Sequence, residues 1–127
     1  MKRVLIIHSV FDPVIEKDLA ELKAQDLRRD VAERGENLGV EWLAENISDK
    51  FPAKTIPRGY DAYLIHHSDV NPQDLTNLRR EQPQCKLLSL RPAYLIENDE
   101  RELYDKFYFG WTRDNRRRIL DEIGGER

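Results

Sequence analysis

The sequence predicts a three-layer, doubly wound α/β domain with a mainly parallel five-stranded sheet in the order 2-1-3-4-5. Apolar runs at Arg3–Ile7, Ala62–His66 and Lys86–Leu90 are typical of strands covered on both faces. Segments with helical periodicity alternate with these runs, and such alternation produces a parallel sheet with helices on both sides. The 127 residues have the size of one domain, so we expect a single domain over residues 1–127.

A long helix follows the first strand. Asp12-Pro13 offers an N-cap and a first-turn proline, and Gly35 is the expected stop, which gives a helix of about 20 residues. Its apolar residues recur at roughly helical spacing: Ile15, Leu19, Leu22, Leu27 and Val31.

The segment between this helix and Tyr60 carries two further expectations. After Gly39, the spacing of Val40, Leu43 and Ile47 predicts a short amphipathic helix that ends at Phe51-Pro52. Ala53–Ile56 lies between two prolines and is the expected second strand. Because proline cannot donate to a strand ladder, this strand belongs at an edge of the sheet.

The second half of the chain supplies the remaining elements. Asn71-Pro72 opens a helix that ends before Pro83, and Asn98-Asp-Glu100 opens a short one with an acidic start. Lys106–Trp111 is rich in aromatic residues and is a predicted strand, after which Thr112 caps a last helix closed by Gly124-Gly125. We expect Lys2–Ile7 and Ala62–His66 to be parallel neighbours at the centre. Predicted core residues are Val4, Ile6, Leu19, Leu64, Leu78, Leu88 and Ile119.

The composition narrows the classes of partner. Net charge is −3, which provides no general attraction for nucleic acid or anionic membranes. No apolar run approaches the roughly 20 residues of a membrane span. We therefore expect neither a membrane nor a nucleic-acid partner. The single cysteine, Cys85, excludes an internal disulfide, fits the reducing cytoplasm and is expected to be a packing residue.

Arginines cluster on the predicted last helix. They are Arg113, Arg116, Arg117 and Arg118. This basic face is either a solvated helix surface or a patch for an acidic partner, and it is smaller than a usual DNA footprint.

Polar side chains gather where the predicted strands end. They are His8, Ser9, Asp12, His66, His67, Ser68, Asp69, Ser89 and Arg91. In open α/β sheets, ligands bind beyond the carboxyl ends of the strands. With the expected strand order, all three histidines of the chain fall on two neighbouring strand ends. Seven of these residues form the candidate polar site: His8, Ser9, Asp12, His66, His67, Asp69 and Arg91.

Three interpretations of this cluster stay open. The imidazoles could bind a divalent metal together with Asp12 or Asp69. A histidine could instead act as a general base beside Ser9 or Ser68, with Arg91 holding an anion. In the third, the histidines only end strands and bond to loop backbone. The turn after the first strand has no glycine-rich phosphate loop, so we expect no nucleotide cofactor there.

Tyr60–Leu90 resembles the middle of a response-regulator receiver domain. That family has Tyr-Asp-x-x-Leu-x-Asp at its third strand, then a proline-containing loop, an amphipathic helix and an apolar fourth strand. Tyr60-Asp61-Ala-Tyr-Leu-Ile65 is similar to this strand, and Lys2–Ile7 is similar to the family's first strand. The resemblance implies a flavodoxin-like or receiver-like fold.

The departures from the family pattern concern its chemistry. The position of the phosphoacceptor aspartate falls on His66, and that of the acidic pair falls on His8 and Ser9. The resemblance therefore implies a pseudo-receiver that works without phosphorylation or a cofactor, through a protein partner or as a homodimer. Expected exposed anchors are Trp42, Tyr104, Tyr108 and Trp111.

A second resemblance leaves an enzyme as the alternative. Arg3–Ser9 and Tyr60–Tyr63 are also similar to the opening strand of TIR-type domains, some of which cleave NAD with a helix-borne glutamate. We assign no residue to that role. The alternative function is thus a small metal-dependent or acid–base hydrolase, or a TIR-like enzyme, with a His/Asp site at the strand ends.

Overall fold

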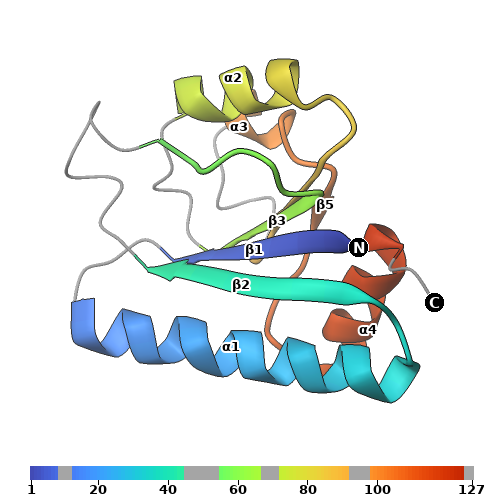
Figure 1. The fold of residues 1–127 in the computed structure, drawn as a ribbon. Coiled ribbons are helices and arrows are strands. Elements are labelled where there is room, and N and C mark those ends of the chain that lie inside the picture. Colours follow the sequence, from blue (N-terminus) through green and yellow to red (C-terminus); the bar gives the residue numbers. More distant parts are fainter. Residues whose placement is uncertain (9–12, 45–54, 67–71, 92–97, 125–127) are drawn as a thin grey trace.

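The computed structural model describes residues 1–8, 13–44, 55–66, 72–91 and 98–124. Five parallel strands form one sheet in the order β2-β1-β3-β4-β5. Their bounds are β1 Lys2–His8, β2 Leu38–Ala44, β3 Ala62–Ile65, β4 Lys86–Ser89 and β5 Lys106–Phe107. The helices are α1 Pro13–Arg34, α2 Pro72–Glu81, α3 Asn98–Arg101 and α4 Arg113–Ile123. Helices α1 and α4 cover one face of the sheet and α2 and α3 the other (Figure 1).

The predicted three-layer fold and strand order are confirmed. The central strands β1 and β3 pair in parallel, with Val4 opposite Ala62 and Ile7 opposite Ile65. Because all five strands run in one direction, their carboxyl ends meet at one edge of the sheet.

The core consists of one apolar cluster on each face of the sheet. Side chains alternate along a strand, so Val4 and Ile6 join the cluster under α1 and α4, whereas Leu5 and Ile7 join the cluster under α2. Six predicted core residues are fully buried: Val4, Ile6, Leu64, Leu78, Leu88 and Ile119.

The prediction for Leu19 is wrong, because 39% of this residue is exposed. Helix α1 contacts the sheet through a different stripe, which consists of Ala20, Ala24, Leu27 and Val31. Two alanines in this stripe let the helix backbone approach the sheet closely. Leu19 and Leu22 are thereby left on the flank of the helix.

The predicted helix ends are confirmed where they are described. Gly35, directly after α1, has φ +65°, the left-handed conformation that glycine adopts without strain. At α4, the Thr112 hydroxyl accepts a hydrogen bond from the Asn115 amide at 3.1 Å, and Gly124 ends the helix with φ 67°. No helix in the described part of the chain is long and apolar enough to cross a membrane.

The predictions between α1 and β3 are wrong where the structure describes them, and residues 45–54 lie outside the described residues. The expected helix over Val40–Ile47 begins instead as strand β2, which pairs with β1 from Leu38 opposite Lys2 to Ala44 opposite His8. The alternation of side chains along the segment explains why it is a strand. Leu38, Val40 and Trp42 pack in the cluster under α1 and α4, whereas Leu43 packs in the cluster under α2. The expected strand Ala53–Ile56 is not a strand in its described part, residues 55–56, and the rest of it lies outside the described residues.

Strand β5 is shorter than the predicted Lys106–Trp111. Its pairing with β4 ends after Phe107, although the Tyr108 amide still donates to the Ser89 carbonyl at 2.8 Å. Gly110 then takes φ +94°, which turns the chain toward α4.

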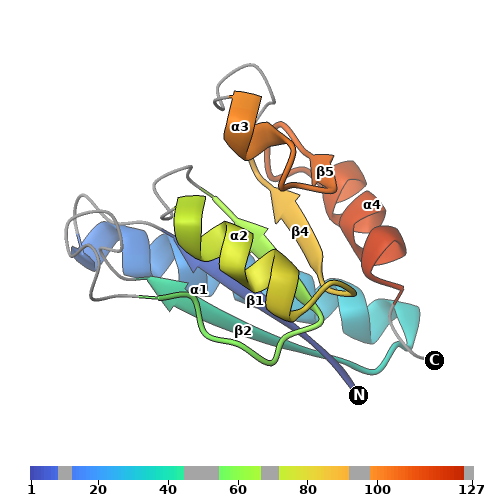
Figure 2. The ribbon, with the colours of Figure 1, turned by 90° about the horizontal axis from the view of Figure 1, so that it is seen from above.

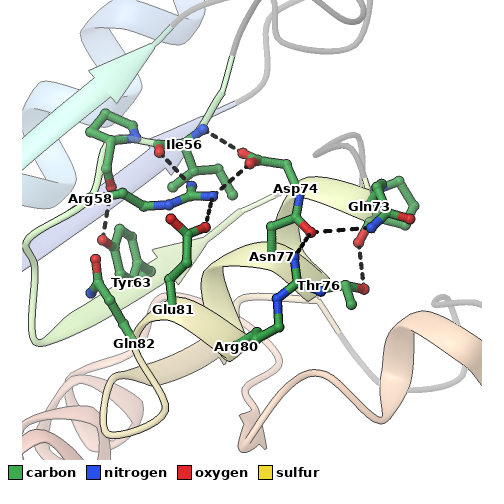
Figure 3. A network of polar contacts seen from close by, with 12 residues as sticks. Ile56, Arg58, Tyr63, Gln73, Asp74, Thr76, Asn77, Arg80, Glu81 and Gln82 are labelled. Atoms are coloured by element: carbon green, nitrogen blue, oxygen red, sulfur yellow. Dashed lines mark hydrogen bonds and ion pairs between the residues drawn. The ribbon is translucent and has the colours of Figure 1, made fainter.

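The segment Ile56–Tyr60 covers part of the sheet beside α2 (Figure 2). Ile56 is 3% exposed and packs with Leu5 and Ile7. Polar contacts hold the segment to α2 (Figure 3), chief among them those of the buried Asp74 with the Ile56 amide and the Arg58 guanidinium. An extended segment therefore covers the apolar sheet surface at this point.

Candidate functional site

Two of the three histidines meet at the carboxyl ends of the central strands. His8 is the last residue of β1 and is fully buried. The His66 amide donates to the Ile7 carbonyl at 2.9 Å, which extends the β1–β3 pairing by one residue. Their rings are stacked, with centroids 4.1 Å apart and planes inclined by 14°. The expected proximity of His8 and His66 is therefore present, in the form of a stack.

This stack does not provide a two-histidine metal chelate. An imidazole nitrogen binds a metal ion in the plane of its ring at about 2.0–2.1 Å. Two nearly parallel planes separated by a stacking distance share no point so close to both rings. Among the described residues, no group of three His, Cys, Asp or Glu side chains could hold a metal ion.

Most of the other polar residues at the predicted strand ends lie outside the described residues. These are Ser9, Asp12, His67, Ser68 and Asp69. Arg91 is described and half-buried, two residues beyond the end of β4. Its amide donates to the Ser89 hydroxyl at 3.1 Å, and that hydroxyl donates to the Arg91 carbonyl at 3.2 Å. Ser89 thus fixes the backbone at Arg91.

A pocket of about 250 Å³ opens beside His66 on the α1 side of the sheet edge. It is lined by Lys23, His66, Leu90, Gly110 and Trp111. Lys23 comes from α1, and Gly110 and Trp111 come from the turn between β5 and α4. The sequence did not predict this pocket. The parallel strand ends, including the turn after β5, are expected to meet at one edge of the sheet. No sequence pattern indicates that Lys23 of α1 lies beside them.

The predicted basic face of α4 is largely paired within the domain. Arg116 is buried and its Nε donates to the Asp30 carboxylate of α1 at 2.6 Å. Arg113 lies 3.7 Å from Glu33. The arginines therefore help to join α4 to α1, which leaves a smaller basic surface than the sequence indicates.

Two of the four predicted aromatic anchors are buried. Tyr104 is 7% and Tyr108 8% exposed, so the prediction that they are surface anchors is wrong. Trp42 and Trp111 are half-buried and pack against the α1 cluster. Among the described aromatic residues, the exposed one is Phe109, at 75%, next to Tyr108 in the sequence. Burial is the main cause that raises the pKa of both Tyr104 and Tyr108.

Comparison with solved structures identifies the fold. The response regulator protein TrrA from Thermotoga maritima, solved in complex with Mg²⁺ and BeF, has a TM-score of 0.61 and 15% identity, with 97% of this chain and 99% of that chain covered. The regulatory domain of the master biofilm regulator CsgD has a TM-score of 0.49 and 15% identity, with 96% and 84% covered. This domain has a receiver-like fold.

Sequence comparison adds nothing to this result. No family model matches the chain, and no curated protein matches it.

Proposed function

We propose that the domain is a receiver-like signalling module that acts through protein contacts and takes no phosphoryl group. The observation that carries this proposal is the stacking of His8 and His66 at the carboxyl ends of β1 and β3. From the sequence resemblance, we align His8 with one of the acidic pair of receiver domains and His66 with their phosphoacceptor aspartate.

The chemistry of these two side chains does not suit the receiver reaction. Magnesium prefers oxygen ligands in near-octahedral geometry, and imidazole is a ligand for softer divalent metals. His66 also offers no carboxylate to form an acyl phosphate. The magnesium ion that the fold family implies therefore does not fit these two positions.

Phosphorylation chemistry provides the direct test. We expect no heat on titration with magnesium and beryllofluoride, and no phosphoryl adduct by intact mass after incubation with acetyl phosphate. A receiver of known activity, such as TrrA, is the positive control in both assays. A stoichiometric adduct on an aspartate of this chain would refute the proposal.

The contact surface is the second part of the proposal. The partner is another protein or a second copy of this chain. Phe109 is the anchor to test first, because exposed aromatic side chains provide much of the binding energy at interfaces. Light scattering after size exclusion should show a dimer that weakens in Phe109→Ser and persists in the exposed control Lys17→Gln. A monomer at every concentration would rule out the homodimer.

A further inference from the structure

We infer that the pocket beside His66 binds a small aromatic carboxylate. The inference starts from the lining residues, which combine an aromatic ring, an aliphatic side chain and two nitrogen-bearing side chains: Trp111, Leu90, Lys23 and His66. Ligand sites in proteins are mostly apolar, with a few polar groups that fix the ligand's orientation. This composition selects a ligand with one apolar face and one anionic group.

The size of the pocket limits the ligand to a small molecule. Its volume of about 250 Å³ lies just below the range of roughly 300–1,000 Å³ that is usual for pockets of drug-sized ligands. A single ring with one carboxylate suits this space. The ring would lie against Trp111 and Leu90, and the carboxylate would face the Lys23 ammonium and the His66 ring.

The walls of the pocket are held in place by contacts behind them. The Trp111 indole N–H donates to Asp26 Oδ2 at 3.1 Å. Asn115 Nδ2 donates to the carbonyls of Phe109 and Gly110, at 2.9 Å each. The His66 ring is stacked on the buried His8 ring. A pocket that is formed before binding requires less ordering of side chains when a ligand enters.

Among the described residues that line the pocket, none is acidic and Lys23 is basic, which favours an anionic ligand. The Lys23 ammonium lies 5.9 Å from the centroid of the Trp111 ring, so positive charge lies beside the aromatic wall. Asp26 lies one helical turn after Lys23 on α1 and is an acidic side chain near this charge. One of its oxygens accepts from Trp111, and the other accepts from Arg29 at 3.0 Å. The carboxylate of Asp26 is thus directed to these two partners.

NMR of the tryptophan side chains tests this inference at constant pH. The chain has two tryptophans, and Trp42 lies on β2, the opposite edge of the sheet from β5. Benzoate should shift the Trp111 indole N–H signal saturably and leave the Trp42 signal in place. Benzamide keeps the ring without the charge, and acetate keeps the charge without the ring. Each should bind at least about tenfold more weakly than benzoate.

Variants of α1 complete the test. Lys23→Gln should weaken benzoate binding by about tenfold or more, since a charge-assisted contact is lost. Lys17→Gln removes the same charge from an exposed position of the same helix and should bind as the parent does. A Trp111 signal that does not respond to benzoate would overturn the inference. So would benzamide that binds as tightly as benzoate, or Lys23→Gln that binds benzoate as tightly as the parent.

Discussion

The imidazole rings of His8 and His66 lie face to face, with 4.1 Å between their centroids, at the carboxyl ends of two adjacent parallel strands. The strand register produces this relationship, because Ile7 is paired with Ile65 and each histidine follows one member of that pair. His8 is completely buried and His66 is half-buried. The two rings therefore lie side by side at the carboxyl ends of the two central strands.

Truncating the buried ring of the pair should destabilise the fold. His8→Ala removes the ring from a site with no solvent exposure and leaves a cavity. We expect a loss of about 2–4 kcal/mol in the free energy of unfolding, as for other large-to-small changes in cores. Urea unfolding at pH 7 measures it. His66→Ala is the matched control and should cost less, because that ring is partly solvated; equal losses would contradict the assigned packing.

Alkaline pH should unfold the domain, with Tyr104 as a principal cause. Burial raises the pKa of the Tyr104 phenol above its ordinary value, with a smaller contribution from the charge of Glu100. The unfolded phenol ionises near pH 10, so its contribution to stability is complete below that pH. The contribution is lost as the pH rises from there toward the folded pKa, because the unfolded state releases the proton more readily.

Unfolding free energies at pH 8 and at about pH 10.5 measure this effect. Tyr104→Phe keeps the ring without the ionisable group. Its free energy of unfolding should therefore fall less between the two pH values than that of the parent. Tyr60→Phe is the control at a half-buried site, where the Arg3 guanidinium lies 4.3 Å from the ring centroid. In this variant, the fall in the free energy of unfolding should stay closer to that of the parent. An identical decrease in the parent and in Tyr104→Phe would show that other groups govern the alkaline limit.

The sequence was sufficient for the central part of the fold. Strands β1, β3 and β4 are short apolar runs bounded by polar or turn residues, and such runs indicate buried parallel strands. The ends of α1 and α4 were predictable because Gly35 and Gly124 occupy left-handed positions that favour glycine.

The failures have local physical causes. In β2, the pair Val40 and Leu43 matches helical spacing, and this coincidence hid the alternation of Leu38, Val40 and Trp42. In α1, the helical spacing of the large apolar residues predicted Leu19 for the core, but the helix packs on the sheet through a stripe that begins with Ala20 and Ala24. At the site, the strand order was enough to bring His8 and His66 together. The stacking of their rings and the contribution of Lys23 depend on side-chain packing that no sequence spacing encodes.

Cys85 should react slowly with thiol reagents in the folded protein. It is 5% exposed, and burial raises the pKa of its thiol, so the reactive thiolate is scarce at pH 8. Reaction with DTNB at pH 8 should be slow in buffer and should accelerate through the urea unfolding transition. A native rate close to that of the unfolded chain would show that Cys85 is open to solvent.

The contacts of Asp74 with Ile56 and Arg58 should be essential for covering the sheet between β2 and β3. Asp74 is 6% exposed and accepts hydrogen bonds from the Ile56 amide at 2.6 Å and from Arg58 Nη2 at 2.9 Å (Figure 3). Asp74→Ala would remove the acceptor of a buried amide and the buried partner of a guanidinium. We expect a loss of about 2–4 kcal/mol in urea unfolding, because a buried donor without an acceptor keeps its full desolvation cost.

Glu81→Gln is the matched control for this prediction. The Glu81 carboxylate also accepts from Arg58, at 2.9 Å, but its side chain is 53% exposed. Exposed ion pairs contribute little, so this change should cost less than about 1 kcal/mol. Hydrogen exchange gives a local measurement, since the Ile56 amide should exchange faster in Asp74→Ala than in Glu81→Gln. Equal exchange rates in the two variants would show that another acceptor protects this amide and that Asp74 does not hold the segment to α2.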